Sequence, residues 1–170
     1  MLFRSELKIL VNEFSNFARM PAVQPTENNL NDLVRETLTL YQQAHRQIVY
    51  HLLPDEKLPI VKIDRDQIKR VLINLFENAV AAMEGAGTVE ITTAYDAELK
   101  MISCSVADDG PGIPFEIKAR LFEPYFSTKK GGTGLGLAIV TSIISDHNGF
   151  VRVRDNKPHG ACFVIELPAV

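Results

Sequence analysis

Long apolar runs, an excess of positive charge and a cysteine framework are all missing from this sequence. No stretch approaches the roughly 18 apolar residues of a membrane-spanning helix, and no signal-peptide pattern opens the chain. The formal net charge of -3 gives no reason to expect nucleic-acid binding. The two cysteines, Cys104 and Cys162, lack metal-ligand spacing. We therefore expect buried free thiols in a reducing compartment, with a disulfide as the alternative.

The first 28 residues differ in pattern from the rest of the chain. Apolar side chains recur there at alternating steps of four and three, the spacing of a helix that packs on other helices. This seam within residues 2–20 comprises Phe3, Leu7, Leu10, Phe14 and Phe17. The helix either docks on its own domain or forms half of a helical hairpin that pairs with a second chain. Because the proline-containing residues 21–28 look like a linker, we favour the hairpin and a homodimer through residues 3–17.

The remaining residues, 29–170, contain grouped helical and extended patterns. Periodicity and capping residues predict helices over 29–46, 64–83 and 134–147. Alternation predicts extended runs over 47–53 and 58–63, and hairpins over 88–107 and 150–167. Because helices and hairpins do not strictly alternate, we expect an α+β sandwich. Three helices should cover one face of a mixed, mostly antiparallel sheet.

Asn74 and Asn78 lie four residues apart, on one face of the second predicted helix. Asn is a poor helix-interior residue, because its polar groups need partners. In one interpretation, both amides bond to neighbouring backbone or solvent. In the other, an amide oxygen binds Mg²⁺, which takes oxygen ligands and is usually shared with substrate phosphates. Glu77 projects about 100° away from Asn78 around the helix, so it is the second-ranked candidate ligand.

Asp108 ends an extended run and precedes a turn with two spaced glycines, Gly110 and Gly112. One interpretation is a plain loop, since Asp-Gly-Pro-Gly is strong turn chemistry. The other assigns a purine to Asp108, because a carboxylate accepts a hydrogen bond from the exocyclic amino group of adenine, which guanine lacks at that edge. The glycines would let the backbone approach the base, and Ile113 could pack on the ring face.

The glycine-rich segment GGTGLGL at 131–137 opens the last predicted helix. Free N–H groups at a helix start suit phosphates, and Lys129 and Lys130 add positive charge beside them. The segment is neither a Walker loop nor a dinucleotide-binding fingerprint. A flexible linker is the alternative interpretation, although glycine hinges also fit a lid that closes over a ligand. Phe122 and Phe126 are either anchors of that lid or ordinary core aromatics.

In the order of these motifs, residues 66–167 resemble the ATP-binding catalytic domain of sensor histidine kinases. The matching motifs are NLFENA (74–79, N box), DDGPG (108–112, first glycine box), LFEPYF (121–126, F box), GGTGLGL (131–137, second glycine box) and GACFVIELP (160–168, closing strand). EFSNFARMP (13–21) and NLFENAVAAM (74–83) further resemble nitrogen-regulation kinases of the NtrY kind. The resemblance implies the Bergerat fold of the GHKL family, a two-layer α/β sandwich that uses ATP and Mg²⁺.

The resemblance also implies roles for individual residues. It places Mg²⁺ at Asn78, adenine at Asp108, and catalysis at Asn78 and Lys129. The implied nucleotide-binding residues are Asn74, Asn78, Asp108, Gly110, Gly112, Ile113, Phe122, Lys129, Lys130, Gly132, Thr133, Gly134, Leu135, Gly136 and Leu137. It divides the chain into the second helix of a dimerisation and phosphoacceptor hairpin (1–20), a linker (21–28) and a catalytic ATP-binding domain (29–170).

The sequence departs from the family pattern at several positions. Ala81 and Ala82 stand where many members carry Lys and Tyr, so phosphate charge would rest more on the lid lysines. Ala161 stands where Ser or Thr often follows the glycine of the closing strand. Asn74 stands where the related gyrase and Hsp90 ATPases place the Glu that activates water. Without that base, transfer to another nucleophile is favoured over hydrolysis.

None of the four histidines, His45, His51, His147 and His159, lies in the phosphoacceptor motif of the family. We therefore predict a kinase fragment that transfers the γ-phosphoryl group of ATP to a histidine on a separate or missing acceptor hairpin. A response-regulator receiver domain would act downstream. The alternatives are a GHKL-type ATPase, a non-catalytic nucleotide-binding or dimerisation module, and a serine-directed kinase. We expect a cytoplasmic chain, which is compatible with a membrane-anchored full-length parent.

Overall fold

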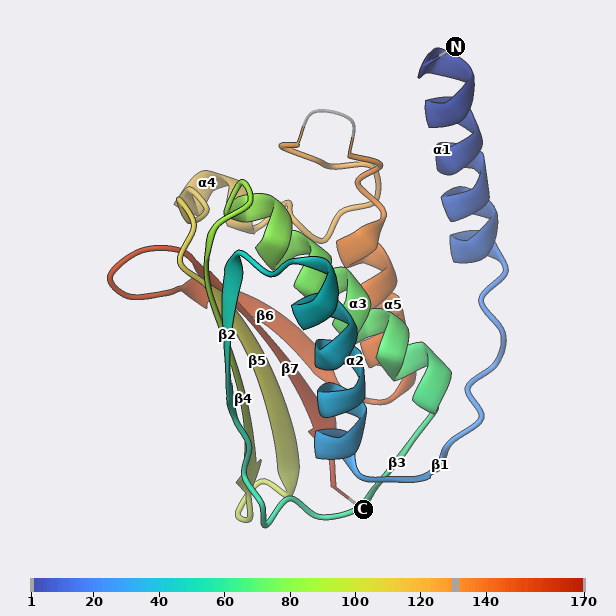
Figure 1. Ribbon diagram of the computed structural model, residues 1–170. Helices are drawn as coiled ribbons and strands as arrows, with labels where there is room; N and C mark the ends of the chain where they lie inside the picture. The colour runs from blue at the N-terminus through green and yellow to red at the C-terminus, as the bar shows by residue number, and fades with distance from the viewer. Residues whose placement is uncertain (1, 130–131, 170) are drawn as a thin grey trace.

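Five strands form one mixed sheet in the computed structural model, which describes residues 2–129 and 132–169 (Figure 1). The strands lie in the order β2 (Ile48–Leu53), β4 (Gly87–Asp96), β5 (Met101–Asp108), β7 (Ala161–Pro168) and β6 (Phe150–Asp155). β2 and β4 run parallel, and the other neighbouring pairs are antiparallel. The predicted mixed, mostly antiparallel sheet with two hairpins is therefore confirmed.

One face of the sheet is covered by α2 (Leu30–Ala44), α3 (Arg65–Ala82) and α5 (Gly136–Asp146), as Figure 1 shows. Side-chain caps start two of these helices, because Asn29 accepts a hydrogen bond from the N–H of Asn31 and Asp64 accepts one from Gln67. The helices pack apolar stripes toward the sheet, with fully buried side chains such as Leu33, Leu72 and Ile143. The predicted α+β sandwich is confirmed.

The cysteines lie in the sheet, as expected. Both Cys104 and Cys162 are buried and free. Burial raises the pKa of Cys104 to about 12, and the nearby Cys162 adds to this effect. Because both side chains are buried, they pack as small apolar groups.

A short two-stranded sheet lies beside the helices. β1 (Thr26–Asn28) pairs antiparallel with β3 (Val61–Ile63). The end of the predicted linker 21–28 is therefore a strand, and the division of the chain at these residues stays a prediction. Hydrogen bonds also join the preceding residues to the start of α3. The N–H of Gln24 donates to the Asp64 carboxylate, and Gln67 Nε2 donates to the carbonyl of Pro21. The three residues of β1 are too few to show an alternating pattern in the sequence.

The N-terminal helix α1 (Leu2–Ala18) stands apart from the sandwich, on the outer side of the helical layer (Figure 1). Phe17 at its end packs on the core, whereas Phe3 is 78% exposed and Leu7 is 49% exposed. This apolar stripe is available for a partner helix, and pairing through residues 3–17 stays a prediction. None of the described helices is long and apolar enough to cross a bilayer.

Candidate functional site

A cleft runs between α3, residues 111–129 and 132–137, and the start of β7. It consists of two adjoining cavities of about 470 Å³ and about 270 Å³. The residues that line both cavities are Asn78, Ala81, Leu121, Thr128, Lys129 and Leu137. The larger cavity reaches Asp108 and the smaller one reaches Gly136 at the start of α5. The aspartate–glycine turn and the glycine-rich loop therefore meet in one cleft, although they are separate in the sequence.

Asp108 occupies the end of β5 and is only 3% exposed. Its Oδ1 accepts hydrogen bonds from the N–H of Gly110 (2.9 Å) and the N–H of Ala161 (3.3 Å). Burial raises the pKa of Asp108, while these two N–H donors act in the opposite direction. Both donors meet the same oxygen, so Oδ2 stays available to a ligand amino group in the larger cavity.

Asn78 and Lys129 meet in the middle of the cleft. Lys129 Nζ donates a hydrogen bond to Asn78 Oδ1 at 3.2 Å. Desolvation lowers the pKa of Lys129, while the charges of Asp108 and Glu77 act to raise it. The amide oxygen of Asn78 therefore already accommodates a cationic group, and it faces the space between the two cavities.

Backbone geometry explains why the loop before α5 needs glycine. Gly134 has φ +71°, and a Cβ there would lie 2.4 Å from the carbonyl carbon of Tyr125. Gly134 also accepts a hydrogen bond from the N–H of Tyr125 (2.9 Å). A Cβ on Gly136 would lie 3.3 Å from Asn74 Oδ1. The loop thus packs closely on its surroundings and presents the first turn of α5 to the smaller cavity.

The structure brings most of the predicted site residues to the cleft. The predicted residues that line it are Asn74, Asn78, Asp108, Gly112, Ile113, Lys129, Gly132, Thr133, Gly134, Gly136 and Leu137. Phe122 does not line it, because its ring packs edge to face on Phe163 with centroids 6.3 Å apart. Leu135 is fully buried in the core, and Gly110 borders a neighbouring surface hollow. Lys130 lies outside the described residues.

Sequence reasoning missed Glu13, which lines the smaller cavity from α1. Its Oε2 accepts a hydrogen bond from the hydroxyl of Thr133 in the glycine-rich loop. Next to it, the rings of Phe14 and Tyr125 stack with centroids 6.4 Å apart. No local pattern could have signalled this contact, because it joins residues that are 120 positions apart.

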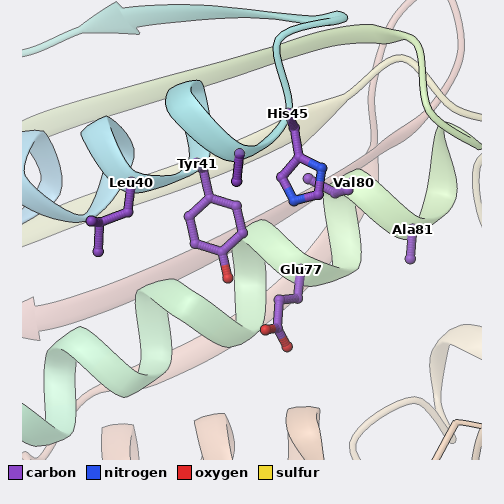
Figure 2. A pocket seen from close by; sticks show the side chains of 7 residues that line it. Leu40, Tyr41, His45, Glu77, Val80 and Ala81 are labelled. Atoms are coloured by element: carbon purple, nitrogen blue, oxygen red, sulfur yellow. The ribbon is translucent and has the colours of Figure 1, made fainter.

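A second groove lies on the other side of α3, against α2 (Figure 2). It has a volume of about 480 Å³ and is lined mainly by apolar atoms around Tyr41, His45 and Glu77. The Tyr41 and His45 rings stack with centroids 5.9 Å apart. The Tyr41 hydroxyl donates a hydrogen bond to the carbonyl of Ile73 at 3.3 Å. The groove contains neither the aspartate turn nor the glycine-rich loop, so its lining does not offer the chemistry of the main cleft.

Residues 63–170 match the family model described as "Histidine kinase-, DNA gyrase B-, and HSP90-like ATPase", which covers more than half of the chain. The chain belongs to this ATPase family. The matched residues correspond to the ATP-binding catalytic part of a histidine kinase, as the sequence motifs predicted.

Curated relatives of this ATPase domain are sensor kinases. The sensory histidine kinase/phosphatase NtrB of Rhodobacter capsulatus is 38% identical over 93% of this chain and 47% of the relative. The nitrogen regulation protein NtrY of Azorhizobium caulinodans is 34% identical over 89% of this chain and 20% of the relative. The resemblance to nitrogen-regulation kinases is confirmed. The chain spans less than half the length of either relative.

Solved structures that are similar to this chain also belong to histidine kinases. The catalytic domain of histidine kinase ThkA matches with a TM-score of 0.79 and 38% identity, over 86% of this chain and 96% of that domain. Full-length ShkA in complex with AMPPNP matches with a TM-score of 0.84 and 32% identity, over 95% of this chain and 35% of that chain. ThkA in complex with the response regulator TrrA matches with a TM-score of 0.84 and 33% identity, over 98% of this chain and 48% of that chain.

Proposed function

We propose that this chain is the catalytic fragment of a sensor histidine kinase, which transfers the γ-phosphoryl group of ATP to a histidine on another domain. The observation that carries the proposal is the continuous cleft with buried Asp108 at one end and the start of α5 at the other. ShkA, a related kinase, is known in complex with AMPPNP, which supports ATP as the ligand.

Asp108 would select adenine through its free Oδ2, which accepts a hydrogen bond from the exocyclic amino group. Lys129 would neutralise phosphate charge, because its ammonium group already lies in the middle of the cleft beside Asn78. The N–H groups in the first turn of α5 would bind phosphate oxygens. The chain would thus act mainly by positioning and charge neutralisation, while the acceptor histidine attacks in line.

Asn78 is the residue that would hold Mg²⁺. Its Oδ1 fits this role, because it is an oxygen ligand that faces the cleft and already accepts a hydrogen bond from a cationic group. When bound together with phosphates, Mg²⁺ would supply orientation and charge neutralisation for the transferred group. Asn74, at the position of the hydrolytic Glu of related ATPases, has no carboxylate to activate water. This difference supports phosphoryl transfer over hydrolysis.

The proposed partners follow from the same assignment. A helical hairpin of the kinase family would supply the acceptor histidine, and α1 would be its second helix or pair in a homodimer. A response-regulator receiver domain would take the phosphoryl group next, which the ThkA–TrrA complex supports by analogy. A cytoplasmic location is proposed for the chain, and its formal net charge of -3 supports the proposal that it has no nucleic-acid partner.

The test is phosphoryl transfer from γ-labelled Mg-ATP. This chain is incubated alone and with a separately prepared two-helix acceptor domain from a related kinase. We expect acid-labile, alkali-stable label on the added domain and none on this chain. Acid-stable label would indicate a serine-directed kinase, and steady release of phosphate would indicate a hydrolase. Tight ATP binding without any label would leave a binding module and contradict the kinase proposal.

A further inference from the structure

The turn of the β6–β7 hairpin packs against the backbone of Asp108. In this turn, Asn156 is half-buried and its Nδ2 donates a hydrogen bond to the main-chain carbonyl of Asp108 at 2.8 Å. The N–H of Asn156 donates to the carbonyl of Gly160 at 3.0 Å, which closes the turn. The side chain of Asn156 is thus held by the turn and faces the strand end that carries the buried carboxylate.

Two further residues of the same hairpin, Gly160 and Ala161, also lie against Asp108. A Cβ on Gly160 would lie 1.8 Å from the carbonyl oxygen of Asp108, and this glycine has φ +108°. Only glycine permits so close a contact. The next residue, Ala161, donates its N–H to Asp108 Oδ1. One hairpin therefore contacts Asp108 at both its backbone carbonyl and its carboxylate.

These contacts divide between the two ends of the residue. Ala161 and Gly110 fix one carboxylate oxygen, whereas Asn156 fixes the peptide group that follows the Cα. The orientation of the peptide sets the direction of the side chain, because χ1 rotates about a bond whose position the backbone determines. Without the Asn156 donor, the carbonyl would lose its side-chain partner. The peptide would then be held only on its other side, where the N–H of Asp109 donates to the carbonyl of Thr88 at 3.2 Å.

We propose that Asn156 is a positioning residue for base recognition, which holds the Asp108 backbone so that Oδ2 points at the exocyclic amino group of adenine. This inference rests on the proposed function, in which Asp108 binds adenine. Asn156 itself does not line the cleft, so it acts through Asp108. It therefore controls the preference for adenine over other bases more than the overall affinity for a nucleoside triphosphate.

The experiment measures dissociation constants of Mg-ATP and Mg-ITP by calorimetry for the 170-residue chain. ITP carries a carbonyl in place of the amino group and cannot donate to Oδ2. The variants are Asn156→Ala, Asp108→Asn and the double variant. Lys157→Ala is the matched control, because Lys157 is an exposed residue of the same turn. Asn156→Leu removes the donor in a side chain of the same branching, and it replaces Asn156→Ala if the latter does not fold. Thermal unfolding verifies that each variant is folded.

We expect the wild-type chain to prefer ATP by about tenfold or more, the usual effect of a hydrogen bond to a charged group. Asn156→Ala should reduce this preference to less than about a third, by weakening ATP binding while ITP binding stays within about twofold. Lys157→Ala should retain the preference. In the Asp108→Asn background, which has lost the preference, Asn156→Ala should change nothing further.

Two results overturn the proposal without touching the proposed function. One is an unchanged preference in Asn156→Ala, and the other is an equal loss of ATP and ITP affinity, which a general structural role would produce. Equal binding of ATP and ITP by the wild-type chain is a different failure. It would show that Asp108 does not read adenine, so both the site assignment and the positioning role would fall.

Discussion

The hydroxyl of Thr133 in the glycine-rich loop donates a hydrogen bond to the carboxylate of Glu13 in α1. The stacked rings of Phe14 and Tyr125 accompany this contact. The Glu13 carboxylate lines the same cavity as Asn78 and Lys129, where we place the phosphates of ATP. In this arrangement, a negative charge of the N-terminal helix faces the site of a highly negative ligand.

Glu13→Gln should therefore bind Mg-ATP more tightly, by about three- to tenfold, because it removes the charge but still accepts a hydrogen bond from Thr133. Calorimetric titration measures this effect, and it should shrink at high salt. Glu6→Gln is the matched control, because Glu6 lies on the same helix but does not line the cleft. Weaker ATP binding by Glu13→Gln would contradict the repulsion and indicate that the contact organises the loop for the nucleotide.

Asp108→Asn should stabilise the nucleotide-free chain. Burial raises the pKa of Asp108 above the ordinary value of 3.8, so the folded state binds the proton more readily than the unfolded state. The contribution of Asp108 to stability therefore falls as pH rises from 3.8 through the raised pKa, and it stays low above that window. The advantage of Asp108→Asn should accordingly grow with pH, as urea unfolding at a series of pH values would show.

Nucleotide binding should have the opposite pH dependence at the same residue. The ionised carboxylate is the better acceptor for the adenine amino group, so affinity for ATP should rise with pH through the same window. Asp108→Asn should lose this dependence together with its preference for ATP. A wild-type affinity that is flat across the window would contradict the role of the carboxylate.

Asn78→Ala should remove the dependence of ATP binding on Mg²⁺. The amide oxygen at this position is the ligand that the chain offers to the metal, so its loss should make affinities with Mg²⁺ and with a chelator nearly equal. Asn16→Ala on the exposed surface of α1 is the control and should keep the difference. A full Mg²⁺ effect in Asn78→Ala would place the metal at other groups.

Gly134→Ala should abolish nucleotide binding, because an added Cβ would collide with the backbone of Tyr125 at 2.4 Å in a conformation with φ +71°. Gly85→Ala separates strain from collision, since Gly85 has φ +102° but no atom within 4 Å of an added Cβ. It should cost about 1 kcal/mol of stability and leave ATP binding intact. Equal behaviour of the two variants would mean that the loop adapts without its glycine.

His147→Phe should destabilise the fold by about 1–3 kcal/mol, because the partly buried N–H of Asp64 loses its acceptor. Nε2 of His147 accepts a hydrogen bond from the N–H of Asp64 at 3.0 Å, and Nδ1–H donates to the carbonyl of Ile143 at 2.7 Å. The histidine thus joins the end of α5 to the start of α3. His51→Gln on the exposed side of β2 should change the free energy of unfolding little. Urea unfolding measures both.

The parts of the site that local patterns encode were predictable from the sequence. The spacing of Asn74 and Asn78 places both on one face of α3, and the alternation of β5 places Asp108 at a strand end. Glu13 and Asn156 were not predictable, because they reach the site through contacts over 120 and 48 positions. The side chain of Leu135 gave no local signal that it would enter the core rather than the cleft.

The most direct test of the central claim is an NMR titration of the chain with Mg-AMPPNP, which compares the main cleft with the groove between α2 and α3. If the main cleft is the nucleotide site, the largest amide shifts should fall at Asp108 to Ile113, at Asn74 and Asn78, and at 132–137. Shifts concentrated around Leu40, Tyr41 and His45, which line only the groove of Figure 2, would contradict the account.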